Sequence, residues 1–301
     1  MDAFHHQQTP RAAAWMAGAL ASFSTMAISA RELSGEIAVH QQLFFRSAIG
    51  FLCLLLIMLV ARFSHSNHLA SSALRLRSQR PGLHVLRNVF HFGGQYGWFV
   101  GIGLLPLAEV FALEFTVPFW TMLIAAVALN EAITRRKLIA IVMGLLGVLA
   151  IVQPGYSIVD SASLIVLAAA IGYAVSHTCT KALGGADSPF TIIFYMCLVQ
   201  LPIGFVLSLA HWQWPDSGQW GWLLLIGLMA LSAHFCMSKA MHYAEVSVVV
   251  TLDFLRLPLI ALLGVVLYAE AFDWAILLGG TLMLAGNIIA LQPLRKQGRT
   301  R

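Results

Sequence analysis

Four charged side chains lie deep inside long apolar segments of the sequence, where an ionised group is costly. At about 1.5 Å per helical residue, each lies roughly 10–15 Å inside a hydrocarbon core that is about 30 Å thick. An ionised side chain at the centre of a membrane costs at least about 2.5 kcal/mol, so such residues face a protein interior or a watery cavity and find partners. The four residues are Arg46, Glu114, Asp253 and Arg256.

The two acids and two bases sum to zero formal charge, which favours pairing within the set. Asp253 and Arg256 are three residues apart on one predicted helix, so they share a face and are expected to pair. Arg46 and Glu114 then form the candidate second pair, between two helices. One interpretation is a structural ion-pair network that locks the helices together. The other is a substrate site or proton relay, in which Arg46 holds an anionic group while an acid takes up and releases a proton.

Histidines and an amide in other apolar segments extend this candidate site. His91 and Gln95 are four residues apart and share one face of a predicted helix, whereas His177 and His234 lie in two further segments. For each histidine alone, a hydrogen-bonded core residue is the favoured interpretation. The candidate substrate-binding or coupling residues are Arg46, His91, Gln95, Glu114, His177, His234, Asp253 and Arg256.

Prolines and glycines are expected to shape the helices around these residues. Pro118 follows Glu114, and Pro258 follows Asp253. Because proline has no backbone N–H and interrupts the helical ladder, each is expected to kink its helix beside an acid. Small residues let helix backbones approach closely, so close packing is favoured over a hinge at the glycines. The crowded glycines are Gly93, Gly94, Gly97, Gly101, Gly103, Gly144, Gly147, Gly279, Gly280 and Gly286.

The segments that carry these residues repeat along the chain. The stretch 113–154 returns weakly at 252–293, with a constant offset of 139 residues. Acids and glycines in matching places are not produced by apolar composition alone. Repeated halves in an apolar chain are typical of transporters, whose halves move around a site between them. The matched pairs include Glu114 with Asp253, Glu131 with Glu270, and Gly147 with Gly286.

The composition requires lipid as the solvent of this chain. It is 59% apolar and 10% charged with a mean hydropathy of +0.81, whereas soluble proteins carry about 25% charge. Segments of about 20 apolar residues are long enough to cross a bilayer as helices. No polar region large enough for a soluble domain remains. The ten predicted spans are 12–31, 38–61, 83–105, 108–129, 137–153, 161–181, 189–210, 218–241, 246–269 and 273–293.

Loop charges predict the direction of these spans. Lys and Arg concentrate in the loops 62–82 and 130–137 and in the tail, whereas the alternate loops carry acids. By the positive-inside rule both termini are cytoplasmic, with the 31–37 turn and its Arg31 as the weak point. Arg87, near a span end, is expected to anchor at the interface. Because each half has five spans, the halves 1–155 and 156–301 must enter the membrane inverted relative to each other.

Several function classes lack their sequence signals. The four cysteines lie in apolar segments without a Cys-x-x-Cys pair, so neither a metal site nor a disulfide framework is expected. No phosphate-binding loop, His-Glu-x-x-His or Gly-x-Ser-x-Gly motif is present, which argues against a membrane enzyme and against a cofactor. The excess positive charge lies in loops, so nucleic acid is not an expected partner. A purely structural scaffold does not need deep charges in both halves.

These motifs resemble the drug/metabolite transporter superfamily, specifically its EamA-type ten-span members. The resemblance covers nearly the whole chain. It implies a bacterial inner-membrane carrier with a central cavity between two halves, and many members are thought to be driven by the proton gradient. The motifs that carry it are L-P-L-A-E-V-F-A-L-E-F-T-V-P-F-W at 105–120, N-E-A-I-T at 130–134, A-E-A-F-D-W at 269–274, G-G-T-L-M-L-A-G at 279–286 and Q-L-F-F-R at 42–46.

The expected function is therefore secondary active transport of a small metabolite or drug, with proton-coupled export as the first hypothesis. The alternative is an importer or facilitator of a vitamin or S-adenosylmethionine-like solute on the same scaffold. The expected partners are a small solute, protons as coupling ion and membrane lipid. The substrate, the direction of transport and the oligomeric state stay open at this stage.

Overall fold

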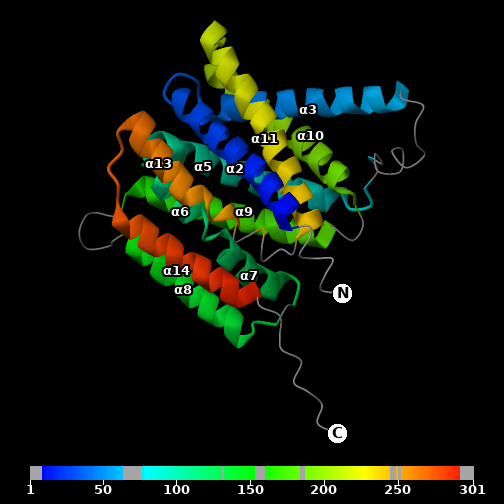
Figure 1. Ribbon diagram of the computed structural model, residues 1–301. Helices are drawn as coiled ribbons and strands as arrows, with labels where there is room; N and C mark the ends of the chain where they lie inside the picture. Colours follow the sequence, from blue (N-terminus) through cyan, green and yellow to red (C-terminus); the bar gives the residue numbers. More distant parts are fainter. Residues whose placement is uncertain are drawn as a thin grey trace.

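The protein folds entirely into helices over the residues that the computed structural model describes, which are 9–63, 76, 78–130, 132–152, 160–183, 187–244, 249 and 252–291 (Figure 1). Among these described residues, six stretches are long and apolar enough to cross a membrane, counting α6 and α7 as one, and α13 and α14 are shorter apolar helices. The elements are α2 (Thr9–Glu32), α3 (Val39–Phe63), α5 (Pro81–Leu104), α6 (Leu107–Glu114), α7 (Val117–Ala128), α8 (Arg135–Val152), α9 (Ser161–Leu183), α10 (Pro189–Ser208), the 3-10 turn η1 (Leu209–His211), α11 (Ser217–Tyr243), α13 (Arg256–Tyr268) and α14 (Trp274–Leu291).

The polarity of the molecule is reversed relative to a water-soluble protein. Polar side chains such as Gln41, Asn88 and Gln200 are fully buried. Large apolar side chains cover the outside, and Val127 is 84% exposed. This arrangement is stable where hydrocarbon is the solvent, because polar groups must then find their partners inside the protein. The chain is a multi-pass membrane protein, as its composition predicts.

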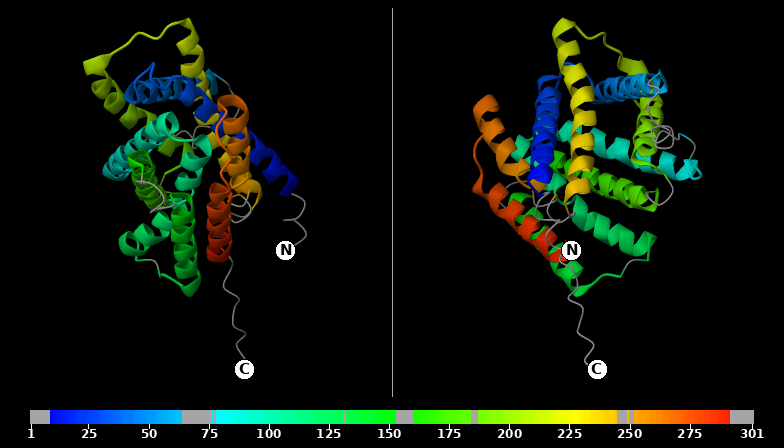
Figure 2. Two further views of the ribbon diagram at one scale, coloured as in Figure 1. Left: turned by 90° about the vertical axis from the view of Figure 1, so that its left-hand side faces the viewer. Right: turned by 45° about the vertical axis from the view of Figure 1, so that its right-hand side comes forward.

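The packing of the helices shows that the two halves are repeats. α2 packs along α11, and α5 packs along α9, while α3 pairs with α10 and α8 with α14 (Figures 1 and 2). The order along the chain makes α9, α10, α11 and α14 the counterparts of α2, α3, α5 and α8. Exchanging the halves therefore reproduces the same set of contacts, which is an approximate two-fold relation. The point at which the halves join lies outside the described residues, so the division at 155 stays a prediction.

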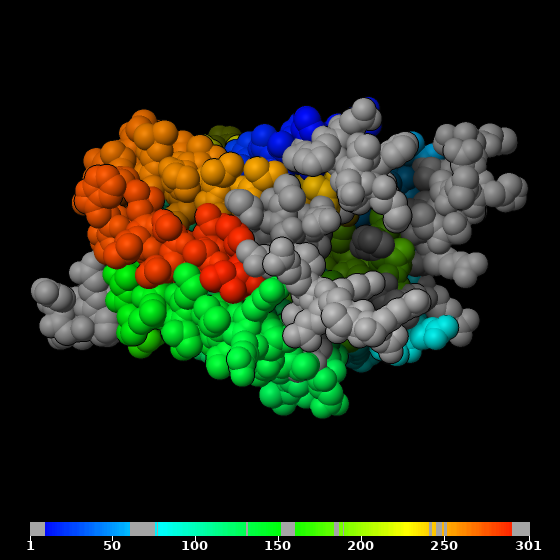
Figure 3. Space-filling model, turned by 60° about the horizontal axis from the view of Figure 1, so that its bottom comes forward, coloured from blue at the N-terminus to red at the C-terminus, as the bar shows by residue number. Residues whose placement is uncertain are grey.

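The α8–α14 pair displays this symmetry residue by residue, and Figure 3 shows the two helices side by side along one face. A Cβ atom on Gly147 would lie 2.8 Å from the carbonyl oxygen of Gly279. A Cβ atom on Gly286 would lie 3.1 Å from the carbonyl oxygen of Ala140. Ala140 and Gly279 are repeat equivalents, as are Gly147 and Gly286, so the helices are antiparallel and each contact occurs twice. The glycines serve close packing here, as expected.

The fourth and ninth predicted spans are each broken at the same place in the repeat. Helix α6 ends at Glu114, and α7 begins at Val117. The other half repeats the break before Arg256, where α13 begins. In both halves an i-to-i−3 hydrogen bond of 3.1 Å tightens the turn. The amide of Thr116 donates to the carbonyl of Leu113, and the amide of Leu255 donates to the carbonyl of Leu252.

The prolines act differently from the predicted kinks. Pro118 and Pro258 fall in the first turn of α7 and α13, not in the interior of a continuous helix. Amide groups in a first turn have no carbonyl partner within the helix, so a proline there removes no hydrogen bond. The spans break completely just before the prolines. The broken ends point a helix N-terminus from each half toward the middle of the molecule, as discontinuous transporter helices do.

Candidate functional site

A cavity of about 340 Å³ lies between the two halves of the molecule. Its size falls within the range of small-molecule sites, which is about 300–1,000 Å³. Helices of both halves supply its walls, and all eight candidate residues from the sequence line it. The lining residues are Phe23, Met26, Arg46, His91, Gln95, Trp98, Glu114, Phe115, Val117, Pro118, Tyr173, His177, His234, Met237, Val249, Asp253 and Arg256.

Three of the four deep charges form one cluster. Arg256 lies 3.2 Å from Asp253, as expected from their spacing, and 3.5 Å from Glu114 in the other half. The indole Nε1 of Trp98 donates a 2.8 Å hydrogen bond to Oε2 of Glu114. The candidate pairing of Glu114 with Arg46, which the sequence left open, is not the one observed, because Glu114 pairs with Arg256. The reason is the pair of helix breaks, which bring the repeat-equivalent acids Glu114 and Asp253 to the same guanidinium.

Aromatic rings hold this cluster in place. The guanidinium carbon of Arg256 lies 4.7 Å from the ring centre of Phe23, and 5.1 Å from those of Phe111 and Phe115. Such contacts favour a cation that has lost its water. Phe115 also stacks on Phe254 with a centroid distance of 4.2 Å and an angle of 15°. These two rings are repeat equivalents, so their stack marks the approximate symmetry axis at the cavity.

Arg46 lies apart from this cluster, although it faces the same cavity. Its residue is only 5% exposed, and its Nε is buried without a hydrogen-bond acceptor. Within the described ranges no carboxylate forms an ion pair with it. Arg87 on α5 differs, because it donates to Thr180 at 2.8 Å and to Asn88 at 2.5 Å and is buried between helices. The prediction that Arg87 anchors at the membrane interface is wrong.

The histidines occupy three different environments. His91 Nδ1 lies 2.8 Å from Nε2 of Gln200, so it is hydrogen-bonded as expected while also lining the cavity. His177 is exposed to the cavity. His234 packs edge-on against Phe23 at 5.9 Å. A hydrogen-bonded core histidine is therefore observed only at His91 among these three.

The sequence reasoning missed the aromatic part of the lining. Trp98 and Tyr173 contribute polar atoms and flat apolar surface, and Phe23 and Phe115 complete the wall. The available signal was spacing, since Trp98 follows Gln95 by three residues and Phe115 is adjacent to Glu114. Only one of the two prolines that were predicted to shape the site lies in the wall of the cavity. Pro118 lines the cavity, whereas Pro258 is exposed and does not.

One end of the cavity is closed by packed helices. From the cavity, α2, α6 and α13 converge through a layer of buried apolar residues that includes Ala30, Leu107 and Ile260. Beyond this layer Glu270 pairs with Arg31 and accepts hydrogen bonds from the amide of Leu107 at 2.9 and 3.1 Å. The carboxylate thus caps the N-terminus of α6, where the partial positive charge of the helix favours it.

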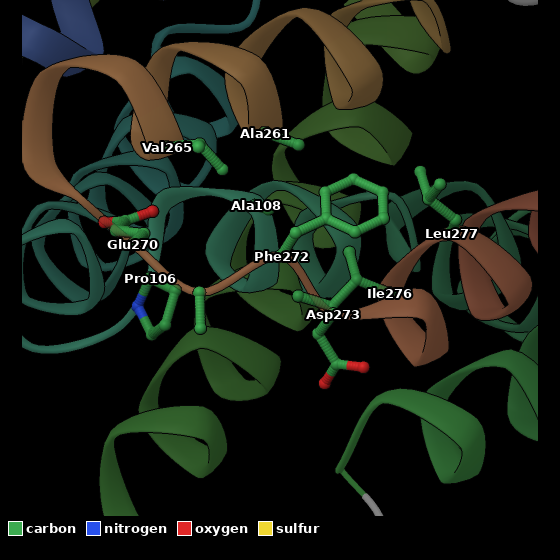
Figure 4. Close-up of a pocket in the computed structure, with 10 residues that line it drawn as sticks. Pro106, Ala108, Ala261, Val265, Glu270, Phe272, Asp273, Ile276 and Leu277 are labelled. Carbon is green, nitrogen blue, oxygen red and sulfur yellow. The ribbon is translucent and has the colours of Figure 1, made fainter.

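Figure 4 shows Glu270 at this closed end, beside Pro106 and Val265. The hollow that they line has a volume of about 10 Å³. That space holds at most about one water molecule, so it is not a solute site. Arg31, the exception in the loop-charge pattern, is neutralised here by Glu270 and stacks on Tyr268 at 5.3 Å.

Comparison with known proteins identifies relatives of this chain. The profile of the EamA-like transporter family matches residues 10–153 and again residues 160–292. The chain is also similar to one crystal structure, with a TM-score of 0.63 at 19% identity over 94% of this chain and 96% of that one. A likeness at this identity supports the fold alone.

Three relatives have named solutes, and the names of two of them give opposite directions of transport. A riboflavin transporter of Vibrio cholerae serotype O1 is 30% identical over 227 residues, covering 74% of this chain and 76% of the relative. An S-adenosylmethionine uptake transporter of Rickettsia felis is 21% identical, covering 94% of this chain and 92% of its own length. A pseudopaline exporter of Pseudomonas aeruginosa is 26% identical, covering 91% and 93%.

Proposed function

This chain belongs to the EamA-like transporter family, and on that premise we propose that it is a secondary active transporter of a small solute. The solute binds in the cavity between the halves, and the halves rock around it in alternating access. One observation carries the proposal: charged and polar residues from both halves, far apart in the sequence, converge on one cavity. The chain is a transporter and not an enzyme.

Proton-coupled export is the proposed mode. Glu114 and Asp253 share Arg256, and the pair of Glu114 with Arg256 joins the two halves, so protonation of Glu114 removes an attraction between them. Because Glu114 belongs to the first half and Arg256 to the second, loss of this attraction favours rearrangement of the halves around the site. Proton uptake is thereby linked to the change of access, as relays of intramembrane acids do in other transporters.

Import of a vitamin or of an S-adenosylmethionine-like solute is the second candidate. It is favoured by the riboflavin and S-adenosylmethionine relatives, whereas the pseudopaline relative favours export. Alternating access is reversible, so the gradients of solute and proton decide the direction. We place the protein in a bacterial inner membrane with both termini in the cytoplasm. The end that carries Glu270 then faces outward.

Solute-triggered proton movement in proteoliposomes tests this function. An imposed pH gradient is followed while amino acids, nucleosides, vitamins and cationic dyes are added singly, with tracer exchange of each solute measured in parallel. One solute class should dissipate the gradient, and Glu114→Gln should abolish that effect. Glu36→Gln is the control, since Glu36 is an exposed acid that bonds Gln219 far from the cavity.

Two results count against parts of the proposal. Tracer exchange without proton movement would remove the coupling and leave facilitated transport. If no solute in the panel exchanges across the membrane, transport through this cavity is refuted for those classes.

A further inference from the structure

This inference rests on the proposed function of the cavity and defines its solute. We infer that the transported solute carries a carboxylate or a similar anionic oxygen group, and that Arg46 is the residue that binds it. The two buried arginines of the cavity thereby have different tasks. Arg256 is neutralised by the protein, and Arg46 is neutralised by the solute.

The different tasks of the two arginines follow from the number of carboxylates that pair with each of them. Arg256 has two carboxylate partners, Glu114 and Asp253, at 3.5 and 3.2 Å. Arg46 is buried to a similar degree, yet no carboxylate pairs with it in the part of the chain that the structure describes. A buried guanidinium without a counter-ion is strongly unfavourable. A solute anion that enters the cavity removes this penalty, so the site favours the charged form of the solute.

The surroundings of Arg46 strengthen its attraction for an anion. Arg87 lies within electrostatic range of Arg46 and is buried nearby, so a second positive charge acts on the same region. The other titratable groups within electrostatic range of Arg46 include Tyr173, Cys197, His91 and His234, and none of these carries a negative charge in ordinary conditions. The field at Arg46 is therefore positive and is not compensated locally.

The helix that carries Arg46 is held rigidly on both sides of that residue. A Cβ atom on Gly204 of α10 would lie 2.9 Å from Cα of Phe44, so α10 lies directly against α3 there. A Cβ atom on Gly227 of α11 would lie 2.7 Å from Cβ of Ile49. Phe44 and Ile49 flank Arg46 in the sequence. Arg46 is thus presented from a fixed backbone, which lowers the entropy lost when a ligand binds.

The remaining lining describes the rest of the solute. Gln95 Oε1 and Asp253 Oδ1 are buried acceptors that receive no hydrogen bond from any residue that the structure describes. They are complementary to N–H or O–H groups of a ligand. Trp98, Tyr173 and Phe23 offer flat apolar surface between these polar positions. A carboxylate with nearby N–H donors and an apolar or aromatic portion satisfies all three features together.

Binding to matched pairs of acid and amide tests the inference without a transport assay. The purified protein in nanodiscs is titrated calorimetrically with N-acetyl-phenylalanine, N-acetyl-leucine and phenylacetate, and with the corresponding uncharged amides. Phenyl phosphate separates carboxylate from phosphate recognition. At least one acid should bind about tenfold or more tightly than its amide, because a hydrogen bond to a charged group is stronger than one between neutral groups.

Variants then assign the preference to Arg46. Arg46→Gln should abolish it, and Arg46→Lys should retain part of it, because lysine keeps the charge without the two-pronged geometry. Arg87→Gln is the comparison variant: it removes a buried guanidinium that does not line the cavity, so it should weaken the preference for the acid only in part, through the reduced positive field, and should not abolish it. Arg46→Gln should also leave the melting temperature unchanged or raised, since it removes an unpaired buried charge.

Any of the following outcomes overturns the inference: no acid that binds better than its amide, a preference that survives Arg46→Gln, or a melting temperature lowered by Arg46→Gln with binding intact. Loss of the preference in both glutamine variants would also overturn it, because the general field and not Arg46 would then be responsible. These results are distinct from those on function. Selective binding without flux refutes transport, and flux without preference for the acid refutes only the role of Arg46.

Discussion

At the scale of single residues, the partners of each buried charge indicate whether it stabilises the fold or is available to a ligand. Arg256 is 4% exposed and joins acids from both halves, so it resembles the structural network considered from the sequence. The same acids remain partly exposed to the cavity and are therefore within reach of protons and solute. The structural interpretation therefore fits Arg256, and the interpretation as a substrate site or proton relay fits the two acids.

Removing Arg256 should destabilise the protein, because two acids then lose their shared cation. Breaking a fully buried pair costs about 3–5 kcal/mol. Partial exposure of both acids to the cavity reduces this to about 2 kcal/mol, closer to the range of solvated pairs. The expected result is a clearly lower unfolding temperature of Arg256→Met in detergent. Adding Glu114→Gln to that variant should recover part of the loss.

Lys239→Met is the control for this prediction. Lys239 rests over the ring of Phe235 at 5.6 Å and does not line the cavity. Its loss should cost about 0.5–1 kcal/mol or less, as for other solvated cation–ring contacts. Equal unfolding temperatures for Arg256→Met and the parent protein would show that the cluster does not stabilise the fold.

At the scale of helices, glycines determine how closely the elements around the cavity approach. Helix α5 carries two adjacent glycines, of which Gly94 packs tightly against α9 and Gly93 faces open space. A Cβ atom on Gly94 would lie 3.0 Å from the carbonyl oxygen of Ala169 and 3.0 Å from the ring of Tyr173. A Cβ atom on Gly93 would meet nothing within 4 Å. The approach of α5 to α9 therefore depends on Gly94, and it positions Tyr173 at the cavity.

Gly94→Ala should destabilise the protein and weaken solute binding, because α9 and Tyr173 must shift to admit the methyl group. Overpacking of this kind costs about 1–3 kcal/mol. Gly93→Ala is the matched control, and it should stabilise α5 by about 0.5–1 kcal/mol through helix propensity. Thermal unfolding and titration of a bound solute measure both effects. Similar behaviour of the two variants would contradict the packing seen between α5 and α9.

At the scale of the whole molecule, the approximate two-fold relation places equivalent elements on opposite sides of one site. Phe115 stacks on Phe254, and Glu114 and Asp253 meet at Arg256. One end of this arrangement is closed by the contact of Glu270 with Arg31 and with the N-terminus of α6. We expect an opening of that end to break this contact, and we therefore predict that the pair controls access to the cavity.

Glu270→Ala should open this end of the cavity. In a cysteine-free variant carrying Met26→Cys at the cavity wall, a membrane-impermeant maleimide added to intact cells should label faster once Glu270 is removed. Faster labelling also requires this end to face outward, which tests the proposed orientation. Glu36→Gln, at an exposed acid of the same end, should leave the labelling rate unchanged. Unchanged labelling in Glu270→Ala would show either that this contact does not close the cavity or that this end faces the cytoplasm, and repeating the assay on inside-out vesicles separates the two.

The sequence alone predicted the apolar segments, the repeat and the polar residues that line the cavity. These features follow from local quantities, because bilayer thickness sets the length of apolar segments and buried charge is costly wherever it occurs. Arg46, Glu114, Asp253 and the histidines are therefore recognisable as polar groups within apolar segments, and all of them line one cavity. The inverted halves followed from the repeat offset and the loop charges.

Only the tertiary structure decided which partner each of these residues has. Whether Glu114 pairs with Arg46 or with Arg256 depends on distances between helices, which packing sets and the sequence pattern does not record. Helix packing also decides that Arg87 is buried and that aromatic rings such as Phe23 surround Arg256. The complete breaks at 115–116 and 254–255 also escaped prediction. A proline in the sequence predicts an interruption, but the position of the break depends on the turn that precedes it and on the contacts that hold the two new helix ends.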